Sequence, residues 1–209
     1  MNSNWAEENL QTIRTLMERS ALYRRALAPI MLLAGILGIL AGAAGFLFHL
    51  NSFLQFQGLW LGTAVIALAG SFFIARKQAI KDQEIFWSSP TRRVAEALIP
   101  FLAVGFFLGT LVTFWGTLHG DAFNFAAPPV WVLFYGCALY AAGFFMPRGM
   151  KVFGLLFMAF GCGLFAIILV KTNWLDDMNP HLLMGFFFGL LHLAYGIYLY
   201  FTEKKNPVA

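Results

Sequence analysis

The chain has 209 residues, of which 60% are hydrophobic and 11% charged, and its formal net charge is +4. A soluble domain is typically about 45–50% apolar and about 25% charged, so this composition excludes an ordinary soluble protein and predicts a polytopic membrane protein. The small positive charge requires no nucleic-acid partner, because membrane topology and anionic lipid are sufficient to explain it.

The first segment, 1–25, is predicted to form a cytoplasmic amphipathic helix. Asn4 can cap its start, and Leu10, Ile13 and Met17 recur at helical spacing opposite a charged face. Such a helix is expected to lie on the inner leaflet. The alternative is a cytoplasmic helix that packs on its own loops.

The segment 26–201 is predicted to be a transmembrane bundle, followed by a cytoplasmic tail over 202–209. A hydrocarbon core of about 30 Å needs roughly 20 apolar residues per helix, and long uncharged runs rule out an open sheet or a barrel. The expected fold is all-α, with an interfacial helix before six spans. These spans are 27–48, 58–75, 95–118, 130–146, 152–170 and 182–201.

The distribution of positive charge predicts the orientation. Thirteen of the 14 Lys and Arg residues would lie inside, and only Lys171 outside, so both termini are expected in the cytoplasm. The inner positive residues form a candidate surface for docking of lipid or a protein partner, with a solvated topology determinant as the alternative. The residues in question are Arg14, Arg19, Arg24, Arg25, Arg76, Lys77, Arg92 and Arg93, the last four on a predicted inner loop, 76–93.

Glycines at helical spacing predict close contacts between spans. The first span has Gly35, Gly38, Gly42 and Gly45 on one face, and GFFLGTL in the third span (Gly105, Gly109) is echoed by GFFFGLL in the sixth (Gly185, Gly189). The echo would also fit two inverted three-helix repeats, as in some transporters.

Two local features concern the ends of spans. Glu96 lies within a turn of Arg92 and Arg93, which favours an interfacial salt bridge over a proton relay. Asn179 followed by Pro180 predicts the cap and first turn of the last helix.

Four motifs taken together resemble one protein family. They are IRTLMERS (13–20), RKQAIKDQ with SSPTRRV (76–94), VLFYGCALY (132–140) and GLLHLAYGIYLYF (189–201). They are similar to a family of uncharacterised bacterial six-helix integral membrane proteins with an amphipathic MExS-type leader and an LHxxYGxxxY-type last helix. The segment 24–29 departs from the SGLSG-like start of that family's first span. The resemblance implies six helices in a bacterial cytoplasmic (inner) membrane and no particular activity.

Three histidines are predicted at the outer ends of spans, namely His49, His119 and His181. With Asp121, Asp176 and Asp177 nearby, imidazole and carboxylate groups would suit a Zn or Cu site. The alternative is that these histidines cap helices and remain hydrated.

His192 is predicted near the midplane of the membrane, with Tyr195 on the same face. Cys137 and Cys162 are expected at similar depth, so these residues would suit a soft metal site, a haem ligand or a quinone contact. The alternative is a histidine hydrogen-bonded between helices, with the two cysteines as small hydrophobic residues.

No nucleotide-binding, metalloprotease or serine-hydrolase motif is present, so we expect a non-enzymatic protein that has no cofactor. The leading hypothesis is an accessory subunit, scaffold or membrane sensor acting through a protein partner or self-association in the bilayer. The first alternative is a small-solute transporter or channel, with His192, Tyr195 and Glu96 along its path. The second is a metal-, haem- or quinone-binding membrane protein.

Overall fold

The computed structural model describes residues 26–83, 85–119, 127–146, 148–170 and 178–203. The predicted leader helix over 1–25 and the chain after 203 lie outside the described residues. The same holds for four members of the predicted docking surface, Arg14, Arg19, Arg24 and Arg25.

Every regular element in those described ranges is helical, which confirms the all-α prediction. In chain order they are a first described helix (Ala26–Leu47), α2 (Phe53–Lys81), α3 (Ser89–His119), α4 (Ala127–Ala142), α5 (Arg148–Leu169) and a last span composed of α6 (Pro180–Met184), the π-helix η2 (Gly185–Leu190) and α7 (Leu191–Glu203). Five are long and apolar enough to cross a membrane, whereas α4 has only 16 residues. These helices indicate a membrane protein.

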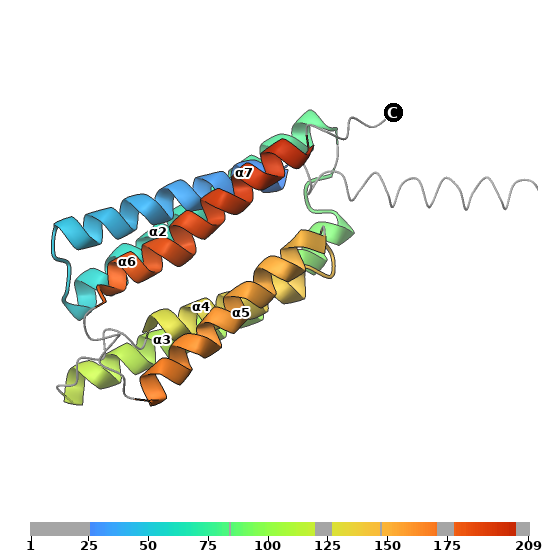
Figure 1. Ribbon diagram of the computed structural model, residues 1–209. Coiled ribbons are helices and arrows are strands. Elements are labelled where there is room, and N and C mark those ends of the chain that lie inside the picture. The colour runs from blue at the N-terminus through green and yellow to red at the C-terminus, as the bar shows by residue number, and fades with distance from the viewer. Residues whose placement is uncertain (1–25, 84, 120–126, 147, 171–177, 204–209) are drawn as a thin grey trace, which may run out of the picture.

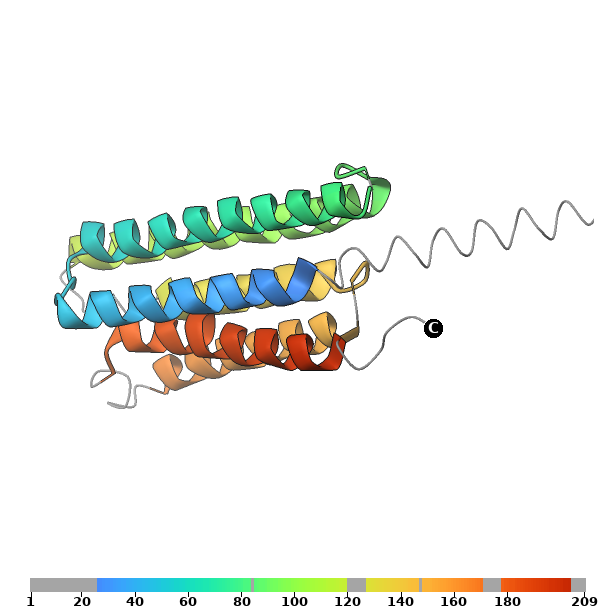
Figure 2. The ribbon, with the colours of Figure 1, turned by 90° about the horizontal axis from the view of Figure 1, so that it is seen from above.

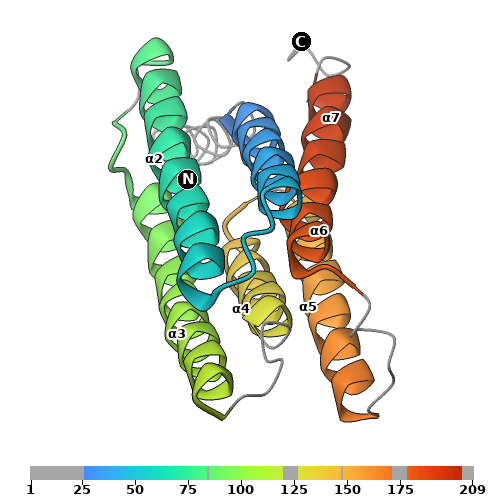
Figure 3. The same cartoon turned by 90° about the vertical axis from the view of Figure 1, so that its left-hand side faces the viewer.

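The helices lie in two layers (Figure 1). One layer contains the first described helix, α2 and the last span, and the other contains α3, α4 and α5. From above (Figure 2), α2 and α3 lie at one edge and α5 and the last span at the other, with the first described helix and α4 between them. The end view in Figure 3 shows the same order. The main apolar core lies between the two central helices on one side and α5 with the last span on the other, around Met31, Val132, Phe157 and Phe187.

The first described helix and the last span approach each other through glycine. A Cβ on Gly38 would collide with the backbone carbonyl of Phe188, and a Cβ on Gly42 would lie 2.9 Å from Cα of Gly185. Only glycine permits such an approach of two backbones. This contact fixes the position of the last span, which contains both buried histidines.

The predicted inner loop over 76–93 is mostly helical, which corrects the expectation from the sequence. α2 continues to Lys81 and α3 begins at Ser89, so the connection is only 82–88. The stretch RKQAIK has no Gly or Pro and consists mainly of good helix formers, so the helix continues past the apolar run. It ends where Gln83 adopts a positive φ of 55°.

The start of α2 also differs from the predicted position, Gly58. Ser52 caps the helix: its Oγ accepts from the backbone N–H of Gln55 at 3.4 Å, and Oε1 of Gln55 accepts from the N–H of Ser52 at 3.3 Å. This reciprocal capping box satisfies two otherwise unpaired donors. The helix therefore begins five residues before the predicted apolar span at Gly58.

α4 starts three residues before the predicted 130 and ends four residues before the predicted 146. Pro128 and Pro129 are accommodated in its first turn, where backbone N–H groups have no intrahelical partner. At the other end the chain tightens, with Phe144 N–H bonded to Ala141 O at 3.3 Å. The Asn179 cap of the last span is confirmed, since its Oδ1 accepts from His181 N–H at 2.9 Å.

Candidate functional site

His192 is the most deeply buried polar residue of α7, with 1% of its surface exposed. Its Nε2 lies 2.7 Å from the hydroxyl of Tyr135 on α4, and its Nδ1 lies 3.0 Å from the carbonyl oxygen of Phe187. Because a carbonyl only accepts, Nδ1 has the proton, and Nε2 of the neutral ring accepts from Tyr135. Both ring nitrogens are therefore engaged.

The π-helix explains why the Phe187 carbonyl can accept from a side chain. Leu191 N–H donates to Phe186 O, five residues back. The chain then returns to α-helical spacing, in which each N–H donates to the carbonyl four residues back. This change of spacing leaves one carbonyl without a backbone donor, and that carbonyl is the one of Phe187, which follows Phe186. The Nδ1–H of His192 donates to this oxygen, so the imidazole completes the backbone bonding of the π segment.

Aromatic rings enclose His192. Its ring centroid lies 5.2 Å from that of Phe153, 5.5 Å from Phe157 and 6.0 Å from Phe188. Tyr195, which the sequence suggested as a neighbour in a cofactor site, instead stacks on Phe153 at 4.5 Å. The hydrogen-bonding partner is Tyr135, and its mid-span position in VLFYGCALY is the signal that could have identified it.

His181 forms a second buried centre near the other end of the last span, with 0% of its surface exposed. Trp60 Nε1 of α2 donates to its Nδ1 at 3.2 Å, and its Nε2 lies 2.9 Å from the carbonyl oxygen of Leu50, to which it donates. This ring therefore has the tautomer opposite to that of His192. It ties α2 and the end of the first described helix to the last span.

His49 ends the first described helix in a Schellman motif. Leu50 N–H donates to Gly45 O at 3.1 Å and His49 N–H to Phe46 O at 3.3 Å, with His49 at a φ of 49°. The motif places the Leu50 carbonyl where His181 donates to it. His49 thus takes part in capping this helix and is exposed, in agreement with the alternative that the sequence offered for it.

The outer metal site remains a prediction. The side chain of His119 and the residues Asp121, Asp176 and Asp177 lie outside the described residues, whereas both ring nitrogens of His181 take part in hydrogen bonds. In the described ranges, no group of three His, Cys, Asp or Glu residues could hold a metal ion. Cys137 and Cys162, the candidate ligands of a separate soft metal site with His192, are free thiols, the first half-buried and the second exposed.

The glycines predicted to pack all meet other parts of the protein. Gly35, Gly38, Gly42 and Gly45 face the last span, and Gly185 and Gly189 face the first described helix. Gly105 and Gly109 of α3 instead contact the side chains of Phe134 and Trp131 on α4. The two echoed motifs therefore pack differently, one against backbone and the other against aromatic rings.

The four described members of the docking surface lie on helix ends. Arg76 and Lys77 are in the last turns of α2, and Arg92 and Arg93 are in the first turns of α3. Arg92 Nε forms the expected ion pair with Glu96 Oε1 at 3.2 Å, and both side chains are 63% exposed. The predicted salt bridge is confirmed, and an exposed pair of this kind contributes about 0–1 kcal/mol.

Comparison with known proteins adds no relationship, because no protein-family model, curated protein or solved structure matches the chain. The resemblance of its motifs to a bacterial family stays a prediction. The class that the fold defines is an all-helical protein with apolar helices of membrane-spanning length. Within it, two buried histidines join helices through hydrogen bonds at both ring nitrogens.

Proposed function

We propose that the chain is a six-span protein of the bacterial inner membrane that acts without catalysis, as an accessory subunit, scaffold or sensor, through a transmembrane helix of a partner that packs on α2. The partner is a companion protein or a second copy of this chain. The orientation proposed is that with both ends of the chain in the cytoplasm.

The exposure of α2 is the observation that supports this proposal. In its most apolar stretch of 18 residues only 6% are buried, against 33% in the corresponding stretches of the first described helix and of the last span. Gly58 and Gly62 lie one turn apart on its exposed surface, and no atom lies within 4 Å of the place of a Cβ on either. Each glycine weakens a helix by about 0.5–1 kcal/mol relative to alanine, and this spacing is that of helix–helix contacts in membranes.

The two buried histidines favour a partner role over a transport path. His192 is enclosed by aromatic rings and both its nitrogens are bonded within the bundle. Glu96, which the transporter hypothesis places along the same path, is on the surface and paired with Arg92. The described polar groups around His192 therefore serve to join helices.

Crosslinking in the membrane tests the proposed contact. A photoreactive amino acid replaces Gly62 in one variant and Val152 in another, because Val152 is a 65% exposed residue on α5 at the far edge of the bundle. We expect a covalent adduct from position 62 and little from position 152. An adduct of twice the mass of the chain identifies a second copy, and any other defined mass identifies a companion.

Equal labelling at both positions, or no adduct from position 62, would contradict the proposal. The orientation is tested separately with an impermeant maleimide on intact cells that express cysteine variants lacking Cys137 and Cys162. Asn51→Cys should react, and Gln83→Cys should react only after the cells are opened. The reverse pattern would show the opposite orientation.

A further inference from the structure

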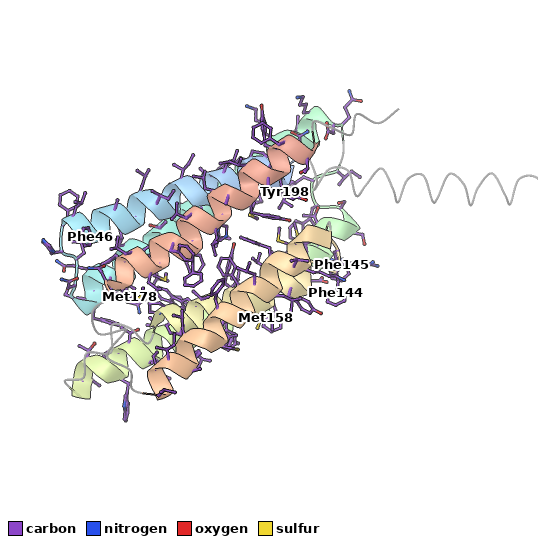
Figure 4. The ribbon with its side chains drawn as sticks, in the orientation of Figure 1. Phe46, Phe144, Phe145, Met158, Met178 and Tyr198 are labelled. Atoms are coloured by element: carbon purple, nitrogen blue, oxygen red, sulfur yellow. The ribbon has the colours of Figure 1, made fainter. Side chains whose placement is uncertain are left out.

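An apolar groove of about 500 Å³ lies on the surface where α3, α4 and α5 meet. We call it the α3–α5 groove. Its walls include Ala97 and Phe101 of α3, Tyr140 and Cys137 of α4, Met158 of α5, and Phe144 in the turn after α4. Figure 4 shows Phe144, Phe145 and Met158 gathered on this layer of the bundle.

The groove lies beside the end of a short helix. At 1.5 Å per residue, the 16 residues of α4 span about 24 Å, less than a hydrocarbon core of about 30 Å. α4 ends at Ala142, and the turn that follows contributes Phe144 and Phe145 to the groove. Apolar space is therefore left open at this level of the membrane.

Each wall of the groove has a basic residue at this end. On α3, Arg93 precedes Ala97 by four residues and Phe101 by eight, so it lies on the face that lines the groove. On the α5 side, Lys151 Nζ lies 3.6 Å from the ring centroid of Phe144. Arg92, next in sequence to Arg93, pairs with Glu96 instead.

We infer that the α3–α5 groove binds one anionic glycerophospholipid, with the phosphate between Arg93 and Lys151 and an acyl chain along Ala97, Tyr140 and Met158. A protein helix about 10 Å across would fill this volume with little more than one turn, whereas a single acyl chain needs only an apolar surface of this extent. The cations match a phosphate, and the apolar walls match a hydrocarbon chain. This site rests only on residence in a membrane and goes beyond the proposed contact on α2.

Native mass spectrometry of the purified chain tests the site, with phosphatidylglycerol or phosphatidylcholine added in equal amounts. We expect one phosphatidylglycerol molecule to be retained at lipid concentrations where phosphatidylcholine is lost. Replacing Arg93→Gln or Lys151→Gln should weaken retention about fivefold each, since a basic residue near an anionic headgroup contributes a factor of about that size. Arg92→Gln is the matched control and should change retention less than twofold.

The apolar part of the site is tested by filling the groove. Ala97→Phe places a ring in it and should abolish retention, whereas Ile99→Phe, on a 61% exposed position of the same helix, should not. Size-exclusion chromatography verifies that each variant is folded. Equal retention of the two lipids, or an effect of Arg92→Gln as large as that of Arg93→Gln, would overturn the inference. Neither result depends on α2, so the site and the proposed function fail independently.

Discussion

Removing one hydroxyl tests the buried pair of His192 and Tyr135. In Tyr135→Phe, Nε2 of His192 loses its donor at 2.7 Å, and water cannot replace it because the imidazole is 1% exposed. Leaving a buried group unpaired costs about 1–3 kcal/mol in soluble proteins, whereas side-chain hydrogen bonds within membrane proteins average about 0.6 and reach about 1.7 kcal/mol. We expect the free energy of unfolding to fall by about 1–2 kcal/mol.

A loss of that size should lower the melting temperature by about 2–8 °C for a chain of this length. Thermal unfolding in detergent, followed by tryptophan fluorescence, measures it. Tyr140→Phe is the matched control, because it deletes the same atom from the same helix at a residue whose ring packs on Phe144, and its effect should be below about 0.5 kcal/mol.

The destabilisation by Tyr135→Phe should disappear or reverse when His192 has first been replaced. In His192→Leu the hydroxyl of Tyr135 has lost its acceptor, so a further change of Tyr135→Phe removes an unpaired polar group and should be neutral or stabilising. An equal loss in both backgrounds would refute the assigned hydrogen bond.

Three further predictions use the same unfolding measurement. Gly38→Val should cost about 1–3 kcal/mol because its side chain meets the Phe188 backbone. Gly163→Val on α5 enters open space and should be neutral or slightly stabilising, and equal losses would contradict the packing. His49→Gly should gain about 1 kcal/mol, because a φ of 49° strains any residue with a Cβ, and a loss would indicate a role for the imidazole. Ser52→Ala should cost about 0.5–2 kcal/mol through loss of the capping box, and no change would show that the cap is not formed in the membrane.

The sequence predicts the helices well because membrane burial requires long apolar runs, and five of the six predicted spans correspond to helices long enough to cross a membrane. The first and last residues of each helix are less predictable, since a helix ends where its backbone hydrogen bonding ends and not where the apolar run ends. The Ser52–Gln55 capping box is readable as a motif, but the predicted span starts at Gly58 because the continuous apolar run begins only after Gln57. For the same reason, the apolar run did not predict that α2 continues through Arg76 to Lys81.

The candidate sites are less predictable, because they depend on which helices are neighbours. The depth of His192 follows from counting residues along the last span, but its pairing with Tyr135 requires α4 to lie beside that span. The π-helix has no signature in GFFFGLL that distinguishes it from the echoed motif in α3. The positive φ of His49 also could not be predicted, since it depends on the turn that follows.

The mass of the particle extracted from native membranes tests the central claim, a transmembrane partner on α2, most directly. Native mass spectrometry without detergent exchange should show the 23.3 kDa chain within a larger protein assembly of defined mass. Gly62→Ile, which puts a branched side chain into the proposed contact, should release the free chain. A wild-type chain that is recovered alone, with the same mass as the Gly62→Ile variant, would contradict the account.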